Sequence, residues 1–333
     1  NSGYKRYNIR GNVEVDINKY LTASLNIFGR IQDEIEPGSV GSATLYNNIL
    51  NTPANAYPVF NPNGSLGGNQ TFQSNIYGQL INSGYQQYFS RDGGVDLSIK
   101  RKLDDVLPGL WVKGMLSFYG TLTQSTNRTR SIEVFNMKIG TLNDTTYQRY
   151  GTRADQLNSS TTDNWNQQMY AEASAGYTKQ FKKSGLDVLL LANTQNYRNT
   201  AAELPYIFKA AGTSIAYNYD EKYILELAGN YSGNNRYPVG KQGGFFPAFG
   251  LGWNVANENF FKKSVPFIQT LKLRGSYGKT GGTNPGYYSY NQYYEAATGY
   301  TVGSSASGVS GITQGTIANP GITWEKGNKF NIG

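Results

Sequence analysis

The chain has 333 residues, among them 27 Tyr, 15 Phe, 4 Trp and 40 Gly, while only 16% of its residues are charged. This excess of aromatic residues and Gly, with so little charge, favours strands and turns and excludes helical bundles and coiled coils. There is no Cys and no His, so zinc sites, disulfides, thiol nucleophiles and imidazole bases are excluded. A net charge of +8 suits nucleic acid, anionic lipid or an acidic ligand equally.

Apolar and polar residues alternate with a period of two along much of the chain, which predicts about a dozen strands. The clearest segments, in chain order, are residues 13–17, 21–27, 95–99, 110–118, 169–178, 223–230, 245–255 and 271–277. A short helix is expected around residues 45–50. Residues 299–315 are rich in Gly, Ser, Thr and Ala, so we expect them to be mobile or to order only against a partner.

The links between the predicted strands alternate between short and longer ones. Short links fall near residues 18–19, 103–109, 182–185 and 220–222, and longer ones follow residues 32, 125 and 281. Outer-membrane barrels have this layout, with tight periplasmic turns and long external loops. Tyr and Phe gather at strand ends, as in an interfacial girdle. The longest aliphatic run, residues 188–192, is far shorter than the ~18 apolar residues of a membrane-spanning helix.

We therefore predict an all-β fold that is part of a large antiparallel up-and-down transmembrane barrel. A soluble all-β protein also has alternating strands and stays an alternative. Ala171, Ala173 and Ala175 would make a weak soluble core but an acceptable lipid-facing band. The chain begins without Met or a signal peptide and stops within a strand-like pattern, so we expect an internal piece of a longer chain.

No segment predicts catalysis, a metal site or a cofactor. Residues 275–280 (GSYGKT) end like a phosphate-binding loop, but Leu273 stands where that motif needs Gly, and the segment continues a strand. Acidic pairs on turns, such as Asp104 and Asp105, are typical of solvated turns. The basic and aromatic stretches 85–102 and 128–138 match no nucleic-acid motif, so we expect neither an enzyme nor a nucleic-acid-binding protein.

Two sets of residues are candidates for sites. Flat aromatic faces beside amides suit sugar rings or peptide backbones, and such residues cluster in a predicted external loop. The ligand-binding candidates are Tyr287, Tyr288, Tyr290, Asn291 and Tyr293. Charged residues on the polar face of the strands are expected to line the interior of the barrel or to contact a plug. These are Glu172, Glu226 and Lys272.

Several segments, in this order along the chain, resemble the SusC/RagA-like family of TonB-dependent outer-membrane transporters. Upstream these are residues 4–8 (YKRYN), 51–53 (NTP) and 57–64 (YPVFNPNG). The most characteristic follow at 217–226 (YNYDEKYILE), 235–241 (NRYPVGK), 244–248 (GFFPA), 252–253 (GW), 271–278 (LKLRGSYG) and 319–326 (NPGITWEK).

The resemblance implies a barrel of about 22 strands, of which residues 1–333 supply roughly half, with the plug domain and the C-terminal strands outside the chain. It implies a protein of the Gram-negative outer membrane, embedded in outer-membrane lipid, that actively imports a glycan or peptide ligand. The implied partners are a SusD/RagB-like lipoprotein lid and the TonB complex, which acts through the plug region. Two such transporter–lid pairs would form a homodimer.

Two alternatives stay open. One is a passive porin or a secretion-associated outer-membrane barrel. The other is a soluble all-β protein that binds or cleaves glycans.

Overall fold

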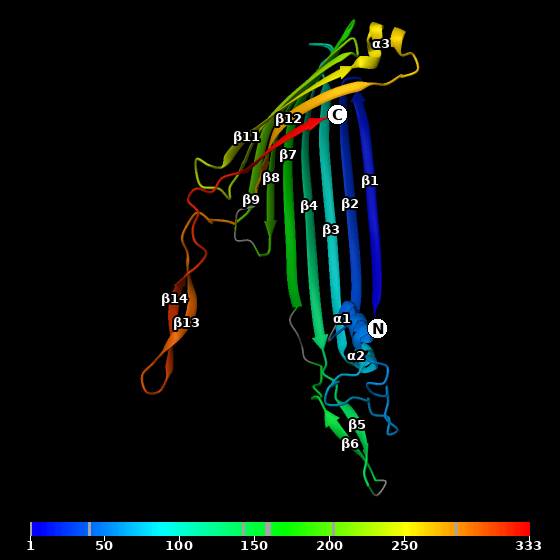
Figure 1. Ribbon diagram of the computed structural model, residues 1–333, viewed down its shortest axis with the longest axis vertical. Helices are drawn as coiled ribbons and strands as arrows, with labels where there is room; N and C mark the ends of the chain where they lie inside the picture. Colours follow the sequence, from blue (N-terminus) through cyan, green and yellow to red (C-terminus); the bar gives the residue numbers. More distant parts are fainter. Residues whose placement is uncertain (1, 39–40, 142–143, 157–160, 202–203, 284–285) are drawn as a thin grey trace.

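The computed structural model describes residues 2–38, 41–141, 144–156, 161–201, 204–283 and 286–333. Within this part of the chain, eleven strands form one antiparallel sheet in the order β1-β2-β3-β4-β7-β8-β9-β10-β11-β12-β15 (Figure 1). Their bounds are β1 (Gly3–Asn18), β2 (Leu21–Pro37), β3 (Gly84–Lys102), β4 (Leu110–Thr129), β7 (Thr161–Phe181), β8 (Ser184–Asn199), β9 (Tyr206–Tyr219), β10 (Tyr223–Asn234), β11 (Gly243–Asn254), β12 (Lys272–Gly282) and β15 (Glu325–Ile332). Each strand pairs with its sequence neighbours in the sheet, so the predicted all-β, up-and-down fold is confirmed.

The three longest links, residues 38–83, 130–160 and 283–324, lie at one end of the sheet, and most of the short links lie at the other. The short links include residues 19–20, 103–109, 182–183 and 220–222. The last link at this end carries the 3₁₀ turn η1 (Val255–Asn257) and helix α3 (Asn259–Ser264), at the top of Figure 1. This link, residues 255–271, is longer than residues 235–242 at the opposite end. The predicted alternation of link lengths therefore holds from β1 to β11 and fails between β11 and β12.

The longer links carry structure of their own. Residues 38–83 contain α1 (Gly41–Asn51), in which the predicted short helix lies, and α2 (Ile76–Asn82). Residues 130–160 contain the hairpin of β5 (Val134–Ile139) and β6 (Thr145–Tyr150). None of the helices in the described ranges is long and apolar enough to span a membrane.

The link between β12 and β15 has a different structure from the one expected from its composition. Residues 299–315 were expected to be mobile or to order only against a partner, yet most of them lie in a hairpin of β13 (Tyr294–Val302) and β14 (Ser307–Gln314). β-Branched and aromatic residues spaced between the glycines explain the pairing, as in Tyr300 opposite Val309. The hairpin stands apart from the large sheet (Figure 1).

The large sheet has one apolar and one polar face, because side chains alternate along each strand. Pairing aligns Val13, Leu25, Leu97, Leu116 and Ala171 across five neighbouring strands. Leu97 is 44% exposed and Leu116 61%. A continuous apolar face of this extent needs an apolar environment, which the lipid around a membrane barrel provides.

The buried apolar side chains lie at the ends of the strands, not in the middle of the sheet. In the described residues they are Leu45, Val134, Tyr237, Val255, Ala256 and Trp324. Side-chain packing therefore stabilises the links, whereas main-chain hydrogen bonds between strands stabilise the large sheet.

Candidate ligand-binding and lumenal residues

The three charged candidates share the polar face of the sheet. Strand pairing aligns Asp187 on β8, Glu226 on β10 and Ser276 on β12 across the sheet. Glu172 and Lys272 are each separated by an even number of residues from a position in this row, which places their side chains on the same face. Their neighbours Ala171, Leu227 and Leu273 point to the opposite, apolar face.

The structure brings only two of these three residues together. Glu226 and Lys272 line one hollow of about 320 Å³ between β10 and β12. Glu172 lies away from it on β7, where its carboxylate accepts hydrogen bonds from the Tyr170 hydroxyl (2.6 Å) and from Ser174 Oγ (3.3 Å). Tyr170 and Glu172 thus stabilise each other along one strand.

An ion pair on the polar face was not foreseen from the sequence. The Arg30 guanidinium on β2 donates to the Asp92 carboxylate on β3, which is only 6% exposed. Thr121 Oγ1 on β4 donates to the same carboxylate at 2.7 Å. Because Arg30 and Asp92 are distant in sequence, no local sequence pattern predicts this ion pair.

The five ligand-binding candidates divide into two groups. The ring of Tyr287 lies 4.9 Å from the Arg236 guanidinium, whose other ring contact is Tyr206 at 4.6 Å. Tyr287 therefore takes part in cation–π packing at the loop end of the sheet. Tyr288 and Tyr290 pack edge to face at 6.0 Å. Tyr288, Asn291 and Tyr293 are exposed.

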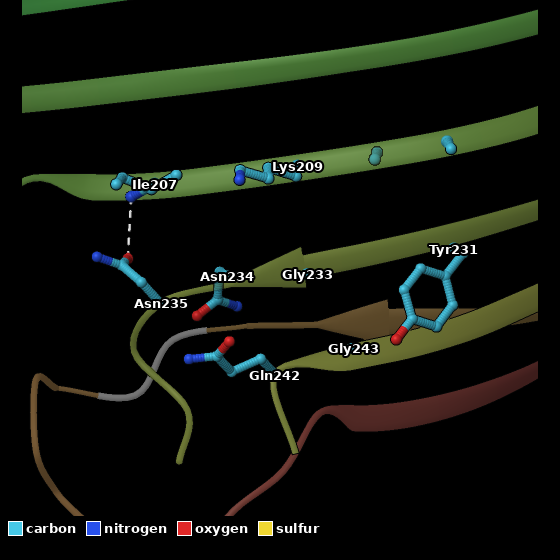
Figure 2. Close-up of a pocket in the computed structure, with 10 residues that line it drawn as sticks. Ile207, Lys209, Tyr231, Gly233, Asn234, Asn235, Gln242 and Gly243 are labelled. Carbon is cyan, nitrogen blue, oxygen red and sulfur yellow. Dashed lines mark hydrogen bonds between the residues drawn. The ribbon is translucent and has the colours of Figure 1, made fainter. Parts of the chain in front are cut away.

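A second hollow, of about 460 Å³, lies at the loop ends of β9, β10 and β11 (Figure 2). Asn235 closes one side by accepting a hydrogen bond from the Ile207 amide at 2.9 Å. The Tyr231 ring lies over Gly243, where a Cβ would meet its hydroxyl oxygen at 1.9 Å. Lys209 supplies the charge of this hollow. None of the sequence candidates lines it.

An aromatic cluster next to this hollow was also not foreseen. Trp324, 5% exposed, packs against Phe246 (5.2 Å), Tyr237 (5.6 Å) and Phe208 (6.4 Å). Its indole nitrogen donates to the Gln242 carbonyl at 3.0 Å. The segments 235–241, 244–248 and 319–326 thus meet at one point, although a long link separates the third from the other two along the chain.

The segment 217–226 turns at the opposite end, where an ionic network joins three links. Lys222 Nζ lies 2.9 Å from Asp220 Oδ2 and 3.7 Å from Glu258 Oε2. The hydrogen bond from Lys222 lowers the pKa of Asp220, and in turn Asp220 raises the pKa of Lys222. Hydrogen bonds from Tyr223 (2.6 Å) and Trp253 (3.1 Å) lower the pKa of Glu258. Lys183 extends the network, 3.5 Å from Asp220 Oδ1.

Comparison with known sequences finds TonB-dependent receptors. The whole chain aligns at 26% identity with TonB-dependent receptor P39 of Formosa agariphila, covering 32% of that protein. A shorter match, over 36% of the chain and at 28% identity, is to TonB-dependent receptor SusC of Bacteroides thetaiotaomicron, covering 12% of it. The chain thus spans about a third of the curated relatives that it matches along its full length. No family model matches.

Comparison with solved structures finds the same fold. The RagAB peptide importer in its closed-closed state superposes with a TM-score of 0.69 over 99% of this chain and 38% of that chain, at 17% identity. The siderophore receptor PirA of Acinetobacter baumannii gives 0.53 over 99% and 40%, at 10% identity. The resemblance inferred from the sequence is thereby confirmed: the chain is homologous to the SusC/RagA-like TonB-dependent receptors of the Gram-negative outer membrane and forms part of a barrel of their kind.

Proposed function

We propose that this chain is part of the wall of an active importer that carries a glycan or peptide across the outer membrane. The observation that carries the proposal is the two-faced sheet. Its apolar face suits lipid, its polar face suits a lumen, and its three longest links are gathered at one end. Wall and loops of this kind bind and guide a solute without covalent chemistry, and the matched relatives are receptors and transporters rather than enzymes.

The proposed partners are inferred from the same similarity to TonB-dependent receptors and to the RagAB importer. TonB would supply energy through a plug inside the barrel, and a SusD/RagB-like lipoprotein would cover the external loops. A homodimer of transporter–lid pairs is part of this proposal. The name RagAB peptide importer supports peptides as one ligand class, and the exposed aromatic and amide side chains of residues 288–293 suit glycans as well.

We assign the ligand contact to Tyr288, Tyr290, Asn291 and Tyr293, and a supporting role to Tyr287. Tyr287 holds the loop through Arg236, whereas the rings of Tyr288 and Tyr293 are exposed and can stack on a solute, with the half-buried Tyr290 packed against Tyr288. Glu172, Glu226 and Lys272 would face the lumen or the plug.

Uptake by cells that produce the full-length protein, with and without a functional TonB, tests the proposal. Two pools would be offered, one of mixed-sequence peptides and one of oligosaccharides, and imported species identified by mass spectrometry. We expect TonB-dependent uptake from one pool, reduced severalfold by Tyr293→Ala. Tyr219→Ala is the matched control, because this tyrosine is as exposed (45% against 46%) but lies at the short-turn end. Uptake that persists without TonB would indicate a passive pore instead.

A further inference from the structure

The hollow between β10 and β12 has a floor made by glycines of β11. Gly250 and Gly252 lie on the polar face opposite Glu226 and Arg274. Neither has a positive φ, so backbone conformation does not require glycine there. Glycine inside a strand otherwise marks a place where another group approaches the backbone closely.

Side chains lean over both glycines without filling the hollow. A Cβ at Gly250 would lie 3.5 Å from Glu226 Oε2, and one at Gly252 would lie 3.1 Å from Lys272 Cε. The remaining lining includes Ser276, Asn331 and the apolar Ile224, whose Cβ would lie 3.4 Å from a Cβ at Gly252. The hollow thus combines mainly polar walls with a floor of glycines.

The charges around the hollow do not neutralise one another. Lys272 and Arg274 are two residues apart on β12, so both face the same side of the sheet as Glu226. Within the described ranges, none of the three forms an ion pair, whereas Arg30 on the same face is paired with Asp92. The lining has two cations and one carboxylate, and Lys329 lies on the same face two residues from Asn331. Positive charge is therefore in excess, which favours an anionic ligand.

We propose that Lys272 and Arg274 bind a carboxylate presented inside the barrel, with its carbon skeleton lying over Gly250 and Gly252. A guanidinium binds a carboxylate through two parallel hydrogen bonds, and the neighbouring ammonium adds positive charge without requiring a particular orientation of the ligand. The inference rests on the proposed function, since it needs the polar face to be the lumen. Two sources share this chemistry: an acidic side chain of a plug segment, and the carboxylate of a transported solute.

Carbodiimide coupling in the full-length protein tests the site directly, because it joins an amine to a carboxylate that already touches it. We expect Lys272 to couple to a carboxylate other than Glu226, as read by peptide mapping. Coupling to an acidic residue of the protein itself, without added solute, identifies a plug segment. Coupling that needs the mixed-sequence peptide pool identifies the solute.

Two variants and one control complete the test. Arg274→Gln should lower the coupling yield about tenfold, and Gly250→Val should lower it with both charges intact. Lys113, on the same face but distant on β4, is the reference amine. Coupling of Lys272 only to Glu226, or at no more than the Lys113 level, would overturn the site. Coupling is measured without transport, so the site can stand even if TonB-dependent uptake fails.

Discussion

Trp324 anchors the long link 283–324 to the wall. Its ring is held by aromatic side chains of three other segments, and its indole nitrogen is hydrogen-bonded to the Gln242 carbonyl. Lys241 adds a contact nearby, donating to the Pro320 carbonyl at 2.8 Å. The candidate ligand residues belong to the same link, so their position depends on this anchor.

Replacing the anchor should loosen the link without unfolding the wall. Trp324→Ala removes a buried ring and a hydrogen bond, a change that costs about 3–5 kcal/mol in packed sites. Hydrogen exchange of the full-length protein in detergent should show lost protection in residues 286–324 and unchanged protection in β1 to β4. Phe267→Ala, at an 82% exposed ring, is the control. Equal protection in Trp324→Ala and the wild type would refute the anchoring role.

The ionic network around Lys222 predicts a pH dependence. The pKa values of Asp220 and Glu258 are lowered in the folded state, so their contribution is complete above their ordinary values near ~4 and is lost as pH falls through the lowered values. The pKa of Lys222 is raised, so its contribution is lost only above its ordinary value near ~10.4. Stability of the short-turn end should therefore be constant near neutral pH and decline in acid.

Lys222→Met is the variant that isolates this network. Without the ammonium, the pKa of Asp220 should rise toward its ordinary value, while the hydrogen bonds from Tyr223 and Trp253 still lower that of Glu258. Thermal unfolding in detergent should therefore show a smaller decline between pH 7 and pH 3. Lys262→Met removes one positive charge from the adjacent α3 and is the matched control. An identical acid profile for Lys222→Met and the wild type would contradict the network's role.

Single residues were the hardest level to predict from the sequence. The motifs containing Tyr237, Phe246 and Trp324 were all identified, but their convergence depends on how the 283–324 link returns over the sheet. Arg30 and Asp92 meet through the pairing of β2 with β3, which separates the partners by a long link. Tyr287 was grouped with its neighbours because sequence spacing gives no sign that its ring faces Arg236.

Strands and links were predicted well, because a period of two is a local property. The predicted strands were too short, however. β4 has 20 residues and β7 has 21, about twice the ~10 needed to cross a membrane. On β4 the apolar face runs from Val112 to Leu122 and continues as Gln124, Thr126 and Arg128. The strands therefore extend beyond the apolar band toward the long links, where no apolar alternation marks them.

The two faces of one strand should respond differently to the same charge. Leu97 lies on the apolar face between Leu25 and Leu116, and the adjacent Ser98 lies on the polar face between Ser24 and Met115. Leu97→Arg should destabilise the barrel by about 2–4 kcal/mol in lipid vesicles, as charges near the bilayer midplane do. Ser98→Arg should cost much less, measured by the same denaturant titration. Equal losses would mean that the two faces meet the same environment.

At the scale of the whole molecule, eleven strands of one sheet agree with the expected half of a barrel of about 22. This architecture could be predicted from the sequence because the alternation of apolar and polar residues recurs in strand after strand. An error in the bounds of one strand therefore does not change the predicted fold. The single sheet, the apolar band and the gathering of the three longest links at one end all fit one wall between lipid and a polar interior.

Site-directed spin labelling along β3 of the full-length protein, in outer-membrane lipid, tests this account most directly. Single labels would be placed at each residue from Val95 to Lys100, and their accessibility to oxygen and to a water-soluble nickel complex compared. Labels at Val95, Leu97 and Ile99 should favour oxygen, and labels at Asp96, Ser98 and Lys100 should favour the nickel complex or be shielded from both. Accessibility that does not alternate, or full access of the nickel complex at both sets of positions, would contradict the account.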